Sequence, residues 1–62
     1  MNNLTREMIL RNISKKEMAK FLGISLVSLY NKLNRKSKFT VDEAMALKNT
    51  YFKDCEYEYL FQ

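Results

Sequence analysis

Apolar residues recur three and four positions apart along most of the chain, which is the spacing of one face of an α-helix. The first such segment is Leu4–Arg11, where Leu4, Met8 and Ile9 fall on one side. The Asn2–Asn3 pair precedes this segment and can cap its start. Glycine occurs once and proline is absent, so the segments contain few helix breakers. The pattern predicts an all-α chain, folded as a compact bundle of four to five short helices.

A second helix is predicted to begin after Ser14. Ser14 and Glu17 match a capping box, in which the serine hydroxyl accepts the Glu17 amide and the Glu17 carboxylate reaches back to the serine amide. Gly23 is expected to end this helix in a left-handed conformation, which costs least for glycine. The inward side of the helix is predicted to carry Met18, Ala19 and Leu22.

A third helix is predicted directly after the short turn Gly23–Ser25, with Ser25 as its cap. Leu29 and Leu33 point to one side of it, and Leu26 lies at the edge of that side. The other side contains no charged residue and is formed by Val27, Tyr30, Asn31 and Asn34. A basic loop, Arg35–Lys38, follows the helix.

A fourth helix is predicted to begin at a second capping box, formed by Thr40 and Glu43, and to run to about Phe52. Its inner face is expected to carry Val41, Ala44, Met45, Lys48 and Tyr51. The tail 54–62 is ambiguous, because acidic residues alternate with tyrosines over 56–59 as in an edge strand. We favour a short helix capped by Asp54, which would bury Cys55, Leu60 and Phe61.

Composition narrows the classes of function. Histidine is absent and Cys55 is the only cysteine, which excludes zinc fingers, disulfide scaffolds, cysteine–histidine nucleophiles and histidine general bases. A chain of 62 residues also leaves little room for a catalytic cleft. We therefore expect no enzymatic activity, no cofactor and no metal site, and we expect Cys55 to be a buried apolar residue. No segment has the roughly 20 apolar residues of a membrane span, nor the pattern of a signal peptide, so we expect a cytoplasmic protein without a membrane partner.

Charge is distributed unevenly along the chain. Residues 1–38 contain nine lysines and arginines and two acidic residues, for a net charge of +7, whereas residues 39–62 have a net charge of −3. Such an asymmetric field can orient a molecule on a polyanion. The charge by itself is equally compatible with an ordinary solvated surface.

The second and third predicted helices together form a helix-turn-helix over residues 14–34. Ala19 is small where the two helices would cross, Gly23 makes the sharp turn, and Leu29 fills the angle between the helices. The stretch from Ser14 to Thr40 resembles the Cro/repressor-type (XRE-like) helix-turn-helix proteins of phages and bacteria. The shared patterns are A-x-x-L-G-I-S, L-x-x-K-L-N and K-S-x-F-T.

The resemblance implies a single domain over residues 1–62 with the lambda-repressor-like fold, whose third helix lies in the major groove of double-stranded DNA. It further implies a small phage or prophage transcription regulator, most simply a Cro-like repressor. Carried over by position, the residues that read bases are Leu26, Val27, Tyr30 and Asn31. The residues expected to contact the DNA backbone are Lys15, Lys16, Ser25, Ser28, Asn34, Arg35, Lys36 and Lys38.

One position departs from the family. Arg35 occupies the place where a glycine often follows the third helix, and a left-handed arginine costs on the order of 1 kcal/mol. Either Arg35 adopts that conformation, or Asn34 does, or the loop takes another path. The assignment of Arg35 as a phosphate contact is therefore weaker than that of Lys36.

Useful specificity usually requires a dimer on two half-sites, because one domain places only a few side chains on bases. The candidates for a homodimer contact are Tyr57, Tyr59, Leu60 and Phe61, which could instead close the core of a monomer. The alternative function is a protein-interaction module that binds and inhibits a partner repressor, with weak or no DNA binding. Phe21, on the outer side of its helix, could serve that role or pack against the first helix.

Overall fold

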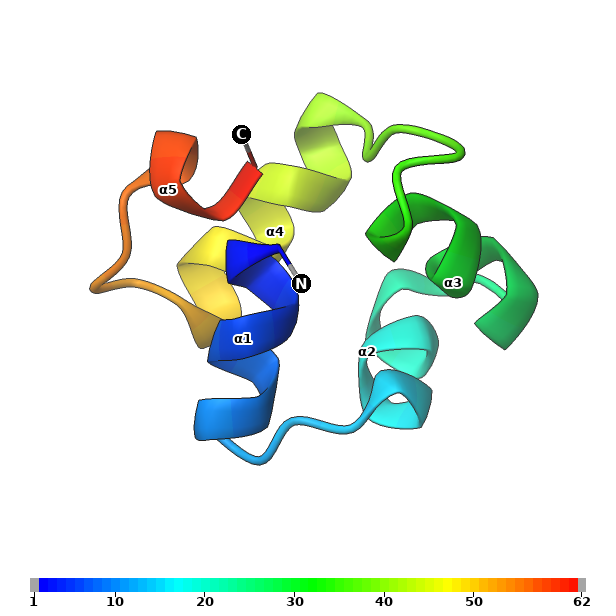
Figure 1. The fold of residues 1–62 in the computed structure, drawn as a ribbon, viewed down its shortest axis with the longest axis horizontal. Coiled ribbons are helices and arrows are strands. Elements are labelled where there is room, and N and C mark those ends of the chain that lie inside the picture. The colour runs from blue at the N-terminus through cyan, green and yellow to red at the C-terminus, as the bar shows by residue number, and fades with distance from the viewer. Residues whose placement is uncertain (1, 62) are drawn as a thin grey trace.

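The computed structural model of the protein describes residues 2–61, and the predicted all-α fold is confirmed. Its five helices pack into one small bundle (Figure 1), with α1 and α5 side by side and α2 and α3 adjacent. The helices are α1 (Asn3–Leu10), α2 (Lys15–Leu22), α3 (Leu26–Leu33), α4 (Val41–Tyr51) and α5 (Tyr57–Phe61). The described part of the chain contains no strand, so the edge-strand alternative for the tail is wrong. None of its helices is long and apolar enough to cross a bilayer.

The first four helices begin where the capping residues predict. In each case the side-chain oxygen of the cap accepts the backbone N–H three residues later, at 2.8–3.1 Å. The four caps are Asn2, Ser14, Ser25 and Thr40. A complete capping box forms at Thr40, whose N–H donates to the Glu43 carboxylate at 2.9 Å. The box predicted at Ser14 is half formed, because the Glu17 carboxylate accepts the Tyr51 hydroxyl at 3.4 Å instead.

Helices α1, α2 and α3 all end in the same backbone motif. A left-handed residue follows each helix: Asn12 (φ 59°), Gly23 (φ 71°) and Arg35 (φ 64°). Its N–H bonds to the carbonyl three residues back, and the next N–H bonds to the carbonyl five residues back. These two bonds define the Schellman motif, which satisfies carbonyls that the helix leaves unpaired. Gly23 was predicted in this role, Asn12 was not, and at the third site Arg35 is left-handed while Asn34 is not (φ −89°).

The core is assembled from all five helices and the residue that ends α4. Phe52, Met18, Leu29 and Leu47 are fully buried at its centre. The remaining members of the cluster are Leu4, Met8, Ala19, Leu33 and Leu60. This small apolar core positions α2 and α3 against the rest of the molecule.

The predicted inner face of α4 is partly wrong. Val41 and Met45 are 70% and 41% exposed, whereas Ala44 and Leu47 are buried and Tyr51 is half-buried. At 3.6 residues per turn, Val41 and Met45 lie about a quarter to a third of a turn away from the buried side. Phe21 packs edge to face on Tyr51 of α4, with ring centroids 5.3 Å apart, and is still 41% exposed.

A polar cluster around Arg11 joins α1 to the segment between α4 and α5. The Arg11 guanidinium donates to both Asp54 carboxylate oxygens at 2.8–2.9 Å, to Glu7 at 3.1 Å and to the Tyr51 carbonyl at 3.0 Å. The hydrogen bond from Arg11 lowers the pKa of Asp54, and the hydrogen bond that the Tyr59 hydroxyl donates to Glu7 lowers the pKa of Glu7. The cluster therefore favours the ionised carboxylates and holds the two ends of the fold together.

Cys55 lies beside this cluster and is half-buried, whereas the sequence analysis predicted a buried residue. Its sulfur accepts a hydrogen bond from Arg11 at 3.3 Å, and burial raises the pKa of the thiol. It packs against the core as a small apolar side chain.

Candidate nucleic-acid interface

Helices α2 and α3 are joined by three residues and pack against each other. Gly23 turns the chain in its left-handed conformation, and the Ile24 N–H donates to the Ala19 carbonyl at 3.0 Å. Ala19 and Leu29 are both buried, as expected for residues between crossing helices. Two adjacent helices joined by this short turn fit the arrangement predicted for residues 14–34, and the burial of Leu29 and Leu33 turns the opposite side of α3 outward.

The outward side of α3 brings the predicted base-reading residues together. Val27 is 69% exposed, Tyr30 47% and Leu26 42%, while Asn31 is half-buried. Asn34 is exposed at the end of the same face. Three large apolar side chains on one exposed face are unusual for a helix that only meets solvent. We name this surface, Leu26, Val27, Tyr30 and Asn31, the α3 face.

Cations border the α3 face at the start of α2. The Lys15 ammonium lies over the Tyr30 ring, 5.6 Å from its centroid, and Lys16 is exposed one residue later. At the start of α3 the Ser25 hydroxyl donates to the Ser28 hydroxyl at 3.1 Å and accepts the Ser28 amide. These predicted backbone contacts are thus grouped beside the first two turns of α3.

The loop after α3 brings a second set of cations to the other end of the α3 face. The Lys36 and Ser37 amides both bond to the Asn31 carbonyl, at 2.8 and 3.2 Å, which folds the loop back onto the helix. Arg35, Lys36 and Lys38 are exposed there. In the two earlier Schellman motifs the residue after the left-handed one is an isoleucine packed on the core, but here it is Lys36.

Lys32 fixes this loop, a role that the sequence analysis missed. Its ammonium bonds to the Glu43 carboxylate and to the Lys38 carbonyl, each at 3.0 Å, and lies 5.8 Å from the centroid of the Phe39 ring. Burial raises the pKa of Glu43, but the hydrogen bonds from the Thr40 amide and Lys32 outweigh it, so the pKa is lowered overall. The i to i+11 spacing of Lys32 and Glu43 across a loop gives no pattern from which the pair could be predicted.

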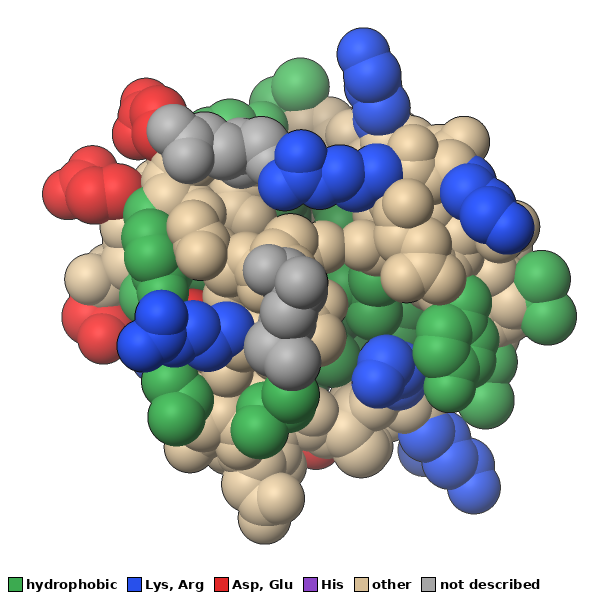
Figure 2. Space-filling model, viewed as in Figure 1, with side chains coloured by type: hydrophobic (Ala, Val, Ile, Leu, Met, Phe, Trp, Pro, Cys, Tyr) green, Lys and Arg blue, Asp and Glu red, His purple; other side chains and the backbone are tan. Residues whose placement is uncertain are grey.

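The charge asymmetry of the sequence is also spatial. In Figure 2 acidic side chains gather at the left edge, over α5 and the segment before it, while Lys and Arg side chains project mainly from the other half of this face. Arg11, which caps the C-terminus of α1, is paired with Glu7 and Asp54. Near α3, Lys16 and the cations of the loop are exposed, and Lys15 is half-buried beside the Tyr30 ring.

The four proposed dimer residues pack largely within the chain. Leu60 is 3% exposed in the core, which leaves little of its side chain for a partner to contact. The Tyr59 hydroxyl donates to Glu7 at 2.8 Å. Phe61 contacts Phe39 and Tyr57, with ring centroids 5.6 and 5.1 Å apart. The tail therefore contributes to the core within one chain, while Tyr57, Tyr59 and Phe61 remain half-buried.

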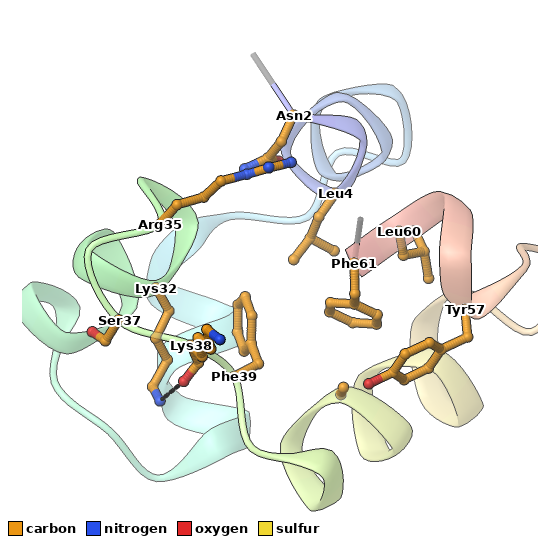
Figure 3. Close-up of a pocket in the computed structure, with 11 residues that line it drawn as sticks. Asn2, Leu4, Lys32, Arg35, Ser37, Lys38, Phe39, Tyr57, Leu60 and Phe61 are labelled. Carbon is orange, nitrogen blue, oxygen red and sulfur yellow. Dashed lines mark hydrogen bonds between the residues drawn. The ribbon is translucent and has the colours of Figure 1, made fainter.

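A cavity of about 400 Å³ opens between the loop after α3 and the α5 side of the molecule. Figure 3 shows Phe39 facing Phe61 and Leu4 across it, with Tyr57 from α5 at one side and Arg35 extending toward Asn2 at the other. It has no group of three metal-ligating side chains, nor does any other part of residues 2–61. Comparison with protein-family models, curated proteins and solved structures gives no match for this chain.

Proposed function

We propose that this protein binds double-stranded DNA sequence-specifically and acts as a small Cro-like transcription regulator in the cytoplasm, with α3 in the major groove. The observation that carries the proposal is the exposed, uncharged α3 face with cations at both ends. Side chains without charge suit the base edges, where hydrogen bonds and methyl contacts are read, and cations suit the phosphates on either side.

The conformation of Arg35 supports a functional role for the loop. A left-handed arginine costs about 1–2 kcal/mol, and such strain persists mainly where function favours it. Glycine would remove that strain but would also remove a cation beside the α3 face. A contact of Arg35 with a DNA phosphate, like those proposed for Lys36 and Lys38, accounts for arginine in place of glycine at position 35.

Two copies on one DNA site are part of the proposal. A single α3 face offers four side chains to base edges, which is too few for useful specificity in a genome. Because Leu60 is buried within the chain, we expect the copies to associate on DNA through other surfaces or through the DNA itself.

A second function is supported by the exposure of Leu26 and Val27. An exposed apolar pair on a helix also suits a protein partner, so the α3 face would bind and inhibit a repressor. In that case DNA binding would be weak and insensitive to changes in the α3 face. Measuring DNA affinity against salt concentration separates the two functions.

The test compares two double variants that lose the same charge. Lys36→Ala with Lys38→Ala removes the cations of the loop after α3, whereas Arg6→Ala with Lys53→Ala removes exposed cations on α1 and after α4. Each phosphate contact contributes about 0.9 to the slope of log K against log salt. The loop variant should reduce the slope by about 1.8 and weaken binding to all sequences about equally. The control variant should change the slope far less, and equal effects of the two variants would refute the proposed orientation.

A further inference from the structure

The α3 face lacks the side chains that read guanine. The commonest specific contact in the major groove is an arginine or lysine that bonds to guanine O6 and N7, and the α3 face contains neither. The neighbouring cations lie at its edges: Lys15 sits over the Tyr30 ring, Lys32 is held by Glu43, and the cations of the loop follow the end of the helix. The face also contains no acidic residue to accept the cytosine amino group.

The side chains that it does present match A·T pairs. Val27 and Leu26 expose methyl groups, and the thymine 5-methyl is the one apolar group on the major-groove edges of the four bases. Asn31 has the amide that bonds to adenine N6 and N7. Val27 and Asn31 are one helical turn, about 6 Å, apart along the helix axis.

From this chemistry, and resting on the DNA binding proposed above, we infer that α3 selects A·T base pairs and recognises thymine 5-methyl groups with Val27 and Leu26. The preferred half-site is then rich in A·T at the positions that α3 covers. Val27 makes the principal methyl contact because it is the most exposed residue of the α3 face.

The experiment begins with the full chain and a random pool of DNA duplexes, from which bound sequences are selected. Each thymine of the selected half-site is then replaced singly by uracil, which removes the methyl group and leaves the base-pairing edge and the phosphates unchanged. Losing one buried methyl group should weaken binding roughly fourfold at a contacted position, which corresponds to about 0.8 kcal/mol. Thymines outside the contacted positions should tolerate uracil.

Two valine variants assign the effect to a residue. Val27→Ala should lose the distinction between thymine and uracil at the position that Val27 contacts, because the two γ-methyl groups of the valine are absent whichever base is present. Val41→Ala is the matched control, since Val41 is equally exposed but lies on α4. Both changes are at exposed positions, so both variants should fold, and the control should keep the fourfold discrimination.

The outcomes separate the two proposals. Specific binding to half-sites rich in G·C, or equal affinity for thymine and uracil at every position, would overturn methyl recognition while DNA binding stands. A distinction between thymine and uracil that Val27→Ala leaves intact would overturn the assignment to Val27. No enriched sequence and no salt-dependent affinity would overturn the DNA-binding function and this inference with it.

Discussion

Replacing Arg35 with glycine should make the protein more stable and a poorer DNA binder. Arg35 is left-handed at φ 64°, a conformation that costs an L-residue about 1–2 kcal/mol and glycine nothing. Glycine gains more freedom in the unfolded chain, which offsets about 0.4–1 kcal/mol of that relief. The net stabilisation is roughly 0.5–1 kcal/mol, which corresponds to a rise in Tm of about 2–8 °C for a domain of this size.

The control is Gly23→Ala, which makes the opposite change at another left-handed position. Gly23 ends α2 in the same motif at φ 71°, and an added Cβ meets no atom within 4 Å, so only the backbone conformation is penalised. Alanine there should lower stability by about 1 kcal/mol and Tm by about 4–8 °C. Gly23→Ala therefore introduces the conformational cost of a left-handed L-residue, which is the cost that Arg35→Gly removes.

Thermal unfolding followed by circular dichroism gives the stability of each variant, and a DNA titration at several salt concentrations gives the affinity. Arg35→Gly should lose about 0.9 from the salt slope if the guanidinium neutralises a phosphate. A lower Tm for Arg35→Gly would refute the strain argument. An unchanged salt slope with a higher Tm would mean that Arg35 carries strain without contacting DNA.

Three further predictions concern the packing of α2 on α3, the contact of Asn31 with a base, and the stability of the fold in acid. Ala19→Leu overpacks the buried site between α2 and α3 and should cost roughly 1–3 kcal/mol in a denaturant titration; wild-type stability would contradict close packing there. Asn31→Ala should lose about 1–3 kcal/mol on the preferred site, with preference relaxed at one position per half-site, and a uniform loss on all duplexes would instead indicate a phosphate contact. Because Arg11 lowers the pKa of Asp54, their pair stabilises the fold fully above the ordinary carboxyl value of 3.8 and is lost as pH falls through the lowered value. Tm measured against pH should drop less steeply in acid for Asp54→Asn, and identical profiles would show that the pair contributes nothing.

Local signals in the sequence predict the parts of this fold that depend on neighbours along the chain. The caps at Ser14, Ser25 and Thr40 and the stop at Gly23 were predictable because each is satisfied within a few residues. The uncharged side of α3 was predictable because Leu29 and Leu33 fix which side is buried.

Features that depend on contacts distant in sequence were not predictable in the same way. The buried side of α4 is set by packing against α5 and the core, and its mixture of alanines and scattered apolar residues left the phase open. The alternation in the tail fits a strand as well as a helix, and the two are distinguished only by the packing of Leu60 in the core. The pairs Arg11–Asp54 and Lys32–Glu43 join segments across turns and leave no periodic signal.

The central claim is that the α3 face and its flanking cations form a DNA-binding surface, and backbone chemical-shift mapping tests it most directly. The amides of a uniformly labelled sample are followed as a selected duplex is added. The account predicts that the largest shifts fall in three groups: the start of α2 at Lys15 and Lys16, residues 26–31, and the loop 35–38. Shifts confined to α1 and α5 would contradict it. An absence of shifts at low salt, where phosphate contacts are strongest, would contradict it as well.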